Sequence, residues 1–367
     1  MTAWARDRYV GRQVRMPTLR AVHSLQVVAL YLMRALGGFA LAHYLTRNRL
    51  RILCYHGFSV GDEFELLPLM FMRAATFDRR MQILKRRRVP IIRLDEAIRR
   101  LQDESITSAE TVITLDDGWE SNLTIGLPIL EKYRYPACIY VTTEHLTAGV
   151  EAFNVALYYM IRRSTCKTLT LSGIHSGVDG VYDIASDPAA AVAQLVGATE
   201  QAFPLAERQR LLAPIAAALG IDLAEVFRGG RLTFLNAAQI QELVQRGVDI
   251  ELHTHTHRLP HDRFELVSLE ISHNRQALKA LTGTEARHFC YPSGEYHAVH
   301  AEWLTRLGLV SAVTCDSGLN TSRTSPMFLK RYLDSEETRD IIFEAEICGV
   351  RDLLRSIRSS ARRLFDS

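Results

Sequence analysis

From about residue 50 onward, the hydrophobic positions follow two spacings, and each spacing predicts a different element. Short apolar runs predict strands, whereas apolar residues three or four apart predict amphipathic helices. The first predicted strands are LRILCYHGF, VPIIRL, TVITLDDG and YPACIYVTT, and the helices between them are ATFDRRMQILKRRR, DEAIRRLQ and GLPILEKYR. Repeated strand–helix units of this kind predict a parallel sheet that crossover helices close or wind.

This alternation breaks between about residues 144 and 230. Three runs there have helical spacing around a polar, turn-rich piece: FNVALYYMIRR, DPAAAVAQLVGATEQAF and RQRLLAPIAAALGI. We expect a mostly helical insertion that covers a site or shapes it for a substrate. The alternation resumes with NAAQIQELVQRG as a helix and VDIELH as a strand.

The N-terminal segment, residues 1–48, is basic at first and then apolar. An arginine-rich stretch leads into AVHSLQVVALYLMRALGGFALAHYL, which is long enough to cross a bilayer but has Arg34 near its middle. A central arginine costs about 2.5–3.5 kcal/mol on insertion scales. We therefore expect an interfacial or re-entrant helix. No small-residue cleavage site follows a short apolar region, so a removable signal peptide is not expected.

The C-terminal segment, residues 341–367, ends in GVRDLLRSIRSSARRLFDS, with apolar residues on one helical face and arginines over much of the rest. Such a helix either lies on an anionic membrane surface or packs on the domain with a solvated basic face. Basic amphipathic elements at both ends favour membrane association. We expect a cytoplasmic protein, peripheral at the inner face of the membrane, with its main domain at residues 49–340.

Composition narrows the function further. The chain has 367 residues and a formal net charge of +3, too small to indicate nucleic-acid binding. Its six cysteines are scattered without a CxxC pair, and most lie in apolar strand-like runs. They are typical of buried, reduced thiols in a cytoplasmic setting.

Two adjacent carboxylates, Asp116 and Asp117, end the strand in VITLDDGWESN. Neighbouring side chains at a strand end point to opposite faces, so one could hold a cation while the other moves a proton. Their mutual repulsion would be relieved by a bound metal ion. The alternative is an ordinary turn, because Asp-Gly is common turn chemistry.

The segment HTHTH, residues 253–257, directly follows another predicted strand. His253 and His257 are four residues apart, so both can converge on one cation if the chain turns helically there. With Asp117 they would form a facial set with open positions for water and substrate. His255 would project elsewhere and has no assigned role.

TLDDG followed far downstream by HTHTH resembles the first two motifs of the polysaccharide deacetylase family, the family four carbohydrate esterases. The resemblance implies that Asp116 is the catalytic base. It also implies that a divalent metal, usually zinc, is bound by Asp117, His253 and His257. Thr254 fills the hydroxyl position of the second motif.

A third segment, FCYPSGEY, is similar to the family's segment that walls the site. Two residues depart from the pattern. Cys290 stands where the family often has an arginine that orients the catalytic Asp, and Ser293 stands where it often has a tyrosine. Because the oxyanion donor at that position is a backbone N–H, Ser293 can keep the role. Arg331 is our candidate for the missing partner of Asp116.

The family's usual acid, a His in a C-terminal motif, has no counterpart after Gly294. ILCYHGF instead carries His56, which resembles the branch of poly-N-acetylglucosamine deacetylases where this motif is permuted to the front. The fold implied is a distorted (β/α)7-type barrel of parallel strands with a mostly helical insertion and helical termini. First and last strands of a barrel are neighbours, so His56 can serve as the general acid. A structural histidine is the alternative.

The expected function is metal-dependent removal of an N-acetyl group from an amino sugar, by a water nucleophile. By resemblance, the substrate is an N-acetylated glycan or a glycolipid, in exopolysaccharide or cell-envelope biosynthesis. Three alternatives stay open at this point. They are a non-catalytic glycan-binding homologue, a membrane scaffold that uses its amphipathic ends, and another metal amidase such as a deformylase that acts on a lipid-linked sugar.

Overall fold

The structure, a computed structural model, describes residues 17–148, 152–203 and 205–365. The predicted basic stretch at residues 1–16 lies outside this range. At the centre is one sheet of seven parallel strands: β1 (Arg51–Tyr55), β4 (Thr111–Leu115), β5 (Cys138–Val141), β8 (Asp249–Leu252), β9 (His288–Cys290), β10 (Ser311–Val313) and β11 (Tyr332–Leu333). Their order across the sheet is β10-β9-β8-β5-β4-β1-β11.

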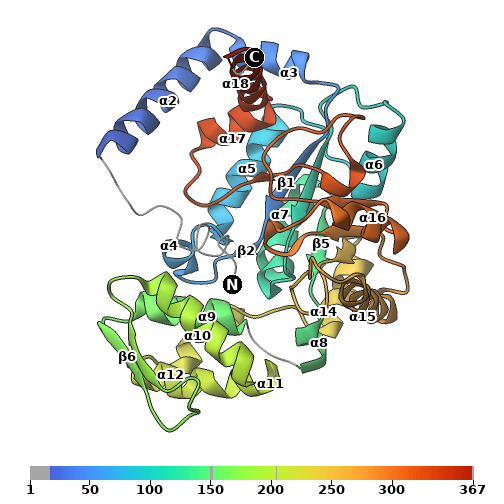
Figure 1. The fold of residues 1–367 in the computed structure, drawn as a ribbon. Helices are drawn as coiled ribbons and strands as arrows, with labels where there is room; N and C mark the ends of the chain where they lie inside the picture. Colours follow the sequence, from blue (N-terminus) through green and yellow to red (C-terminus); the bar gives the residue numbers. More distant parts are fainter. Residues whose placement is uncertain (1–16, 149–151, 204, 366–367) are drawn as a thin grey trace.

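One segment of chain joins the two edges of this sheet. Leu329, directly after the turn η5 (Pro326–Phe328), forms a parallel bridge with Val313 of β10. The chain then continues into β11, which pairs with Leu53 and Cys54 of β1. The sheet therefore curls into the distorted (β/α)7-type barrel that the sequence predicts (Figure 1).

Amphipathic helices cover the outside of the barrel: α5 (Ala74–Arg86), α6 (Leu94–Gln102), α7 (Leu127–Tyr133), α14 (Ala237–Gln245), α15 (Phe264–Thr282), α16 (Val299–Arg306) and α17 (Asp340–Ile347). Their apolar positions face the sheet; in α5, for example, Phe77, Met81 and Leu84 are buried. The short elements β2 (Gly57–Phe58), α4 (Glu63–Leu66), β3 (Phe71–Met72) and the π-helix η1 (Asn122–Gly126) lie at the carboxyl end of β1 and β4.

One predicted strand, VPIIRL, is wrong. Only a single bridge forms there, between Ile91 and Thr111, and helix α6 begins at Leu94. Pro90 has no N–H to donate to a ladder. In addition, β1 pairs along one edge of β4 and β5 takes the other edge from Thr114 onward, which leaves only the start of β4 for this segment.

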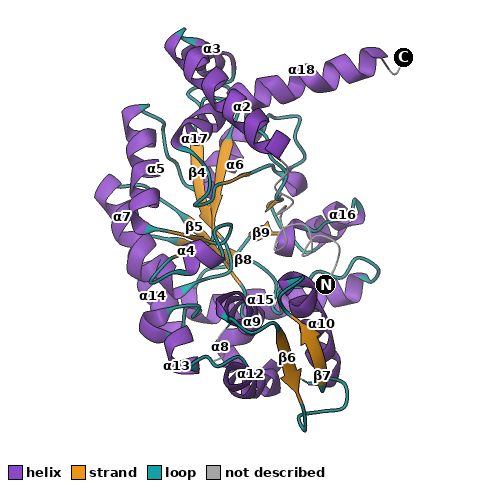
Figure 2. Ribbon diagram, turned by 90° about the vertical axis from the view of Figure 1, so that its left-hand side faces the viewer, coloured by secondary structure: helices purple, strands orange, loops and turns teal. Residues whose placement is uncertain are grey.

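The predicted insertion is mostly helical and has its own hydrophobic core. Its elements are α8 (Glu144–Ala148), α9 (Phe153–Arg163), β6 (Thr168–Leu171), β7 (Gly180–Asp183), α10 (Pro188–Ala202), α11 (Leu205–Arg208), η2 (Gln209–Leu211), α12 (Leu212–Ala218), α13 (Leu223–Val226) and η3 (Arg228–Gly230). The turn-rich piece contains an antiparallel hairpin, β6 with β7, which Figure 2 shows at the rim of the insertion. Its alternation is visible in TLTL, where Leu169 and Leu171 are buried.

Helices α2 (Pro17–Ala35), α3 (Gly38–Leu45) and α18 (Val350–Phe365) lie together at the end of the barrel where the strands begin (Figure 1). In the described part of the chain, no single helix combines the length and apolar composition of a bilayer span. Residues 25–35 and 38–45 meet that test only as a pair, and the two helices are bent by 82° relative to each other.

Candidate metal centre

The register of two neighbouring strands builds the first part of the site. β1 and β4 pair with Tyr55 opposite Leu115, so the next residues, His56 and Asp116, leave the sheet side by side. The Asp116 N–H donates to the Tyr55 carbonyl at 2.9 Å. A ring nitrogen of His56 and a carboxylate oxygen of Asp116 lie within 4.8 Å of each other. Parallel pairing thus brings together two predicted site residues that are far apart in the sequence.

Asp117 turns away from Asp116 because its backbone is left-handed, with φ 76°. Aspartate adopts this region more readily than most residues, and Gly118 follows with φ 84°. The Asp117 carboxylate reaches the end of β8, two strands along the sheet. There its Oδ1 lies 3.2 Å from Nε2 of His253 and 3.4 Å from Nε2 of His257. The ligand triad expected from the sequence is therefore assembled in space.

The orientation of His253 fits a cation at this point. Its Nδ1 lies 2.8 Å from the Cys290 carbonyl oxygen, which can only accept, so Nδ1 carries the proton. In the neutral ring, the Nε2 lone pair then faces the Asp117 carboxylate. Two acceptors this close repel each other unless a proton or a cation lies between them. Two imidazoles and one carboxylate, all within 4.8 Å, form a donor set that suits zinc.

The electrostatics and the solvent exposure of the triad also suit a bound cation. Burial alone would raise the pKa of the Asp117 carboxyl, but its hydrogen bonds with His253 and His257 hold that pKa well below its ordinary value. A cation can take the place of those hydrogen bonds between the same atoms. The His257 side chain is 42% exposed, so one side of the triad opens to solvent.

Helix α15 fixes the loop that carries the two histidines. Glu270 accepts hydrogen bonds from the N–H groups of His255 and Thr256, both at 2.9 Å. Asn274, one turn later and fully buried, accepts from the His253 N–H at 3.0 Å. Our sequence analysis missed both residues. The sequence feature that could have revealed Asn274 is its position: it is a polar residue on the face of α15 that otherwise buries Val267, Ile271 and Leu278.

Trp119, which our sequence analysis also missed, forms a hydrogen bond with the other oxygen of the Asp117 carboxylate. Its Nε1–H donates to Asp117 Oδ2 at 3.0 Å, which leaves Oδ1 to face the histidines. The buried indole stacks on Phe234, with ring centroids 4.6 Å apart, and the two residues form a backbone bridge. Phe234 follows the last element of the insertion. The end of the insertion therefore packs directly on the residue that orients Asp117.

Arg331 lies inside the barrel and pairs with Asp116 through the two terminal nitrogens of its guanidinium. NH1 donates to Oδ1 at 2.7 Å and NH2 to Oδ2 at 2.8 Å. Burial would raise the pKa of Asp116, but the Arg331 charge lowers it to about 2. Nε of Arg331 also donates to the Thr314 carbonyl at 2.8 Å, which fixes the side chain. Asp116 is thus ionised and held in one orientation.

Two cysteine thiols complete the surroundings of Asp116. Cys54 and Cys290 each donate to Asp116 Oδ2 at 3.4 Å. Burial raises the pKa of both thiols well above the ordinary value, so they stay protonated. A cation among these groups would have protonated thiols as ligands and the Arg331 guanidinium beside it. The thiol cluster is therefore a poor metal site compared with the triad.

The remaining predicted residues lie around this centre. Ser293 stands in the turn η4 (Pro292–Gly294) at the end of β9, with φ 60°. A Cβ added to Gly294 would lie 2.5 Å from the Cys315 Cβ, so this turn packs tightly on the end of β10. His255 points away from the triad, because its Nδ1 lies 3.0 Å from the Thr143 hydroxyl.

His56 is neutral at pH 7. Burial lowers the pKa of its imidazole below the ordinary value, and the neighbouring carboxylates of Asp117 and Asp116 oppose this only in part. A neutral imidazole can accept a proton before it donates one. His56 therefore lies beside Asp116 as a neutral imidazole.

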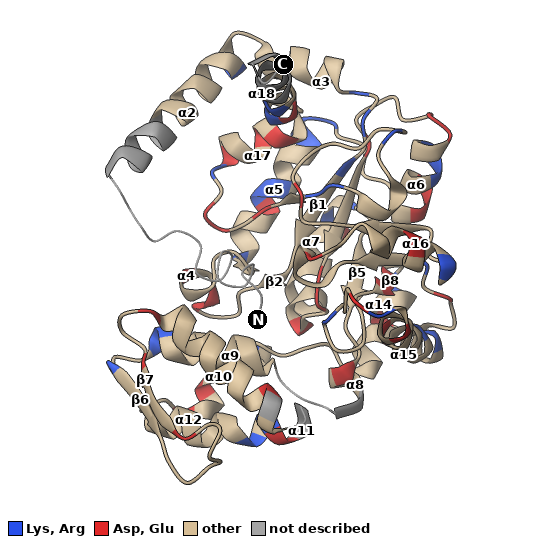
Figure 3. Ribbon diagram, in the orientation of Figure 1, with Lys and Arg blue, Asp and Glu red and all other residues tan. Residues whose placement is uncertain are grey.

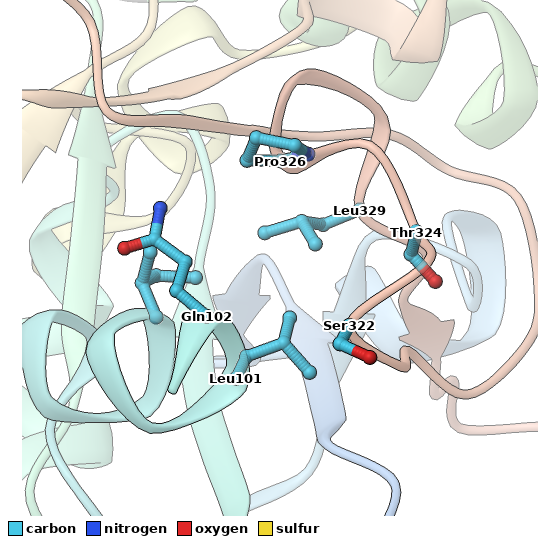
Figure 4. Close-up of a pocket in the computed structure, with 7 residues that line it drawn as sticks. Leu101, Gln102, Ser322, Thr324, Pro326 and Leu329 are labelled. Atoms are coloured by element: carbon cyan, nitrogen blue, oxygen red, sulfur yellow. The ribbon is translucent and has the colours of Figure 1, made fainter. Parts of the chain in front are cut away.

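Two surface hollows lie elsewhere on the molecule. One of about 40 Å³ lies between α6 and the loop before β11, lined by Ile98, Leu101, Gln102, Ser322, Thr324, Pro326 and Leu329 (Figure 4). It has room for little more than a water molecule. The other, of about 320 Å³, lies between α7 and α14 where strands β5 and β8 begin. Neither is lined by a residue of the metal centre.

A sequence model of the polysaccharide deacetylase family matches residues 212–312 of the chain. The matched region contains HTHTH and FCYPSGEY but not the Asp116–Asp117 pair. The resemblance inferred from the motifs is thereby confirmed. No curated protein matches the chain.

Solved structures share the fold at low sequence identity. The Streptococcus pyogenes deacetylase PplD, in complex with acetate, is 16% identical with a TM-score of 0.55, over 82% of this chain and 98% of that one. IcaB from Ammonifex degensii is 17% identical with a TM-score of 0.53, over 82% and 97%. A de-N-acetylase from Aggregatibacter actinomycetemcomitans is 13% identical with a TM-score of 0.51, over 81% and 99%. These likenesses confirm the barrel fold.

Proposed function

We propose that this chain, an amide hydrolase of the polysaccharide deacetylase family, uses a divalent metal to remove the N-acetyl group from an amino sugar. The observation that carries the proposal is the convergence of Asp117, His253 and His257 beside an independent carboxylate, Asp116. The substrate we propose is a glycan or a lipid-linked saccharide. Of the similar solved structures, one is described as a deacetylase and another as a de-N-acetylase.

The metal, zinc by its donor set, would be held by Asp117, His253 and His257 and would supply a Lewis acid that lowers the pKa of bound water. The protein residues around it supply the other parts of an amide hydrolysis. Asp116 accepts a proton from the attacking water. The backbone N–H of Ser293 donates to the oxyanion that forms on the acyl carbonyl.

A single proton passed through Asp116 and His56 suffices for the reaction. Asp116 is a weak base, with a pKa of about 2, so it does not retain a proton. His56, neutral at rest, has a ring nitrogen within 4.8 Å of Asp116 and can take that proton over. His56 then protonates the leaving amine as the C–N bond breaks. Acetic acid and the free amino sugar leave, and both side chains return to their resting charge.

Arg331 keeps Asp116 oriented in this scheme, in place of the arginine absent at Cys290. The altered third motif is the observation that favours the alternative, a non-catalytic glycan-binding homologue. The bidentate Arg331–Asp116 pair, at 2.7 and 2.8 Å, supports the catalytic proposal instead. Both proposals predict glycan binding, and only one predicts acyl release.

The test measures metal content and acyl release together on the full chain. Purified protein is loaded with zinc, and acetate release is followed from a panel of N-acetylated oligosaccharides, with N-formylated analogues to detect a deformylase. Asp116→Asn should retain zinc but lose nearly all turnover, whereas Asp117→Asn should lose both. His255→Gln is the matched control, because His255 lies in the same HTHTH segment but points towards Thr143. Zinc-loaded protein that binds the glycans and releases no acyl group would exclude catalysis.

A further inference from the structure

Exposed apolar side chains gather on three helices at one end of the molecule. Among the described residues, fourteen large apolar side chains are exposed; nine of them lie on α2, α3 or α18, and a tenth, Leu36, lies in the bend between α2 and α3. These ten are Leu25, Val28, Tyr31, Leu32, Leu36, Leu41, Tyr44, Leu45, Leu354 and Ile357. We call the surface they form the apolar platform. Patches this concentrated mark binding surfaces in soluble proteins.

The two N-terminal helices lie on the protein surface rather than continuing as one straight helix. Gly37, with φ 80°, lies at the 82° bend between them. Their inner residues are buried against the protein, including Val27 and Leu30 of α2 and Phe39 of α3. Only the outer faces stay exposed. The inner and outer faces of these helices are thus both apolar, and the protein covers only the inner one.

The platform is fixed to the barrel by a buried arginine. Arg51, the first residue of β1, donates from Nε to the Ile347 carbonyl at 2.7 Å and from NH2 to the Thr46 hydroxyl at 2.7 Å. It thereby joins the ends of α3 and α17. Gly349, where α17 passes into α18, leaves no room for a side chain, because an added Cβ would lie 2.3 Å from the Thr46 hydroxyl. Whatever binds the platform therefore holds the barrel in a defined orientation.

Basic residues border the platform, while its acidic residues are covered. The exposed basic residues are Arg47, Lys85, Arg86, Arg88 and Arg351. Glu344, with 8% of its side chain exposed, is paired with Arg34 and Arg87, which places the basic end of α5 beside α2. In Figure 3 the described parts of α2 and α3 are almost without charge, and blue segments lie next to them. The rim thus carries positive charge around an uncharged centre.

We propose that the apolar platform docks on the surface of an anionic phospholipid bilayer, with its leucines in the headgroup–acyl boundary and the basic rim on lipid phosphates. Tyr44 fits such a boundary, because the Arg47 guanidinium stacks on its ring at 4.0 Å. A second copy of the chain fits less well, since the same face of both copies would bring their basic rims together.

Docking in this way turns the metal centre away from the lipid. The platform lies where the strands begin, and the metal centre lies where β4 and β8 end. The insertion hairpin β6–β7 lies at the end of the molecule opposite to α3 (Figures 1 and 2). If the proposed function holds, the substrate then reaches the site as a glycan chain that extends from the membrane, rather than as a sugar at the lipid surface.

The first test is flotation of the full chain with vesicles. Wild-type protein is expected to float with phosphatidylglycerol vesicles and much less with phosphatidylcholine vesicles. Leu41→Asp should weaken binding about tenfold or more, because burial of one leucine contributes that much. Leu269→Asp on α15 is the matched control, because Leu269 is 52% exposed and Leu41 59%. Leu269 lies outside the platform, so this change should leave binding unchanged. Arg86→Glu with Arg88→Glu should remove the preference for anionic lipid.

The second test measures orientation with spin-labelled lipids as quenchers. A fluorophore at Leu41→Cys should be quenched strongly, and one on Cys166, the exposed native cysteine of the insertion, should not. Equal flotation of wild type and Leu41→Asp would overturn the proposal. It would also be overturned if wild-type protein formed a dimer that did not bind vesicles and if Leu41→Asp dissociated that dimer. Flotation needs no turnover, and zinc-free Asp117→Asn should float like wild type. A failed docking test is thus distinct from a failed deacetylase test.

Discussion

Replacing Arg331 with methionine should destabilise the folded barrel by about 3–5 kcal/mol. Arg331 and Asp116 are 0% and 3% exposed, and their two hydrogen bonds are 2.7 and 2.8 Å long. Methionine retains an unbranched apolar stem like that of arginine but leaves the Asp116 carboxylate buried without its partner. The loss of one member of a buried ion pair costs about this much, because the other charge stays desolvated.

The pKa of Asp116 gives a second measure of the same interaction. It falls from 3.8 to about 2 on folding, a change of about 1.8. At about 1.36 kcal/mol for each unit of pKa, the ionised carboxylate contributes about 2 kcal/mol at neutral pH. Because the folded pKa is depressed, this contribution is present above pH 4 and is lost as the pH falls from about 4 to about 2. In Arg331→Met the Arg331 charge no longer opposes burial, so the pKa of Asp116 should rise and protonation should stabilise that variant.

The assay is urea unfolding of wild type, Arg331→Met, Asp116→Asn and the double variant, each at neutral pH and near pH 4. The double variant should be less destabilised than the sum of the single variants by about 2 kcal/mol or more. Lowering the pH should narrow the gap between wild type and Arg331→Met. Additive single effects, within about 0.5 kcal/mol, would refute the idea that the pair acts as one unit.

Three further predictions concern the groups around the metal centre. Trp119→Phe should weaken zinc binding about tenfold or more, because it removes the hydrogen bond that holds Asp117 Oδ2. Chelator competition measures the zinc affinity, and Trp303→Phe, the control, should leave it unchanged. The rate constant kcat/KM should rise to a plateau as the pH passes upward through the lowered pKa of His56, and His56→Gln should lower the plateau and flatten the rise. A fall over that range would contradict the neutral resting state of His56. Asn274→Leu should cost about 1–3 kcal/mol in thermal unfolding, because it leaves the His253 N–H buried without an acceptor, and should also weaken zinc binding.

The sequence motifs predicted the candidate site residues better than they predicted the residues around them. Asp116, Asp117 and the histidines at 253 and 257 could be recognised because their chemistry is visible as neighbours in sequence. Trp119 and Asn274 could not be recognised in the same way, because a tryptophan after DDG and one polar residue in a helix are compatible with many roles. Their contacts to Asp117 and to the His253 loop arise only when α15 and the end of the insertion pack on the site.

The amino-acid pattern by itself determined most of the order of strands and helices, with the exceptions of VPIIRL and the hairpin β6–β7, and it determined the helical insertion and the presence of ligand-type residues at strand ends. Local periodicity suffices for this, because each element satisfies its own backbone hydrogen bonds or presents one apolar face. Tertiary structure alone decided which strand ends are neighbours, that the candidate Arg331 does reach Asp116, and that the terminal helices leave apolar side chains exposed on their outer faces. These features depend on contacts between residues hundreds of positions apart, which only the closure of the sheet into a barrel brings within reach.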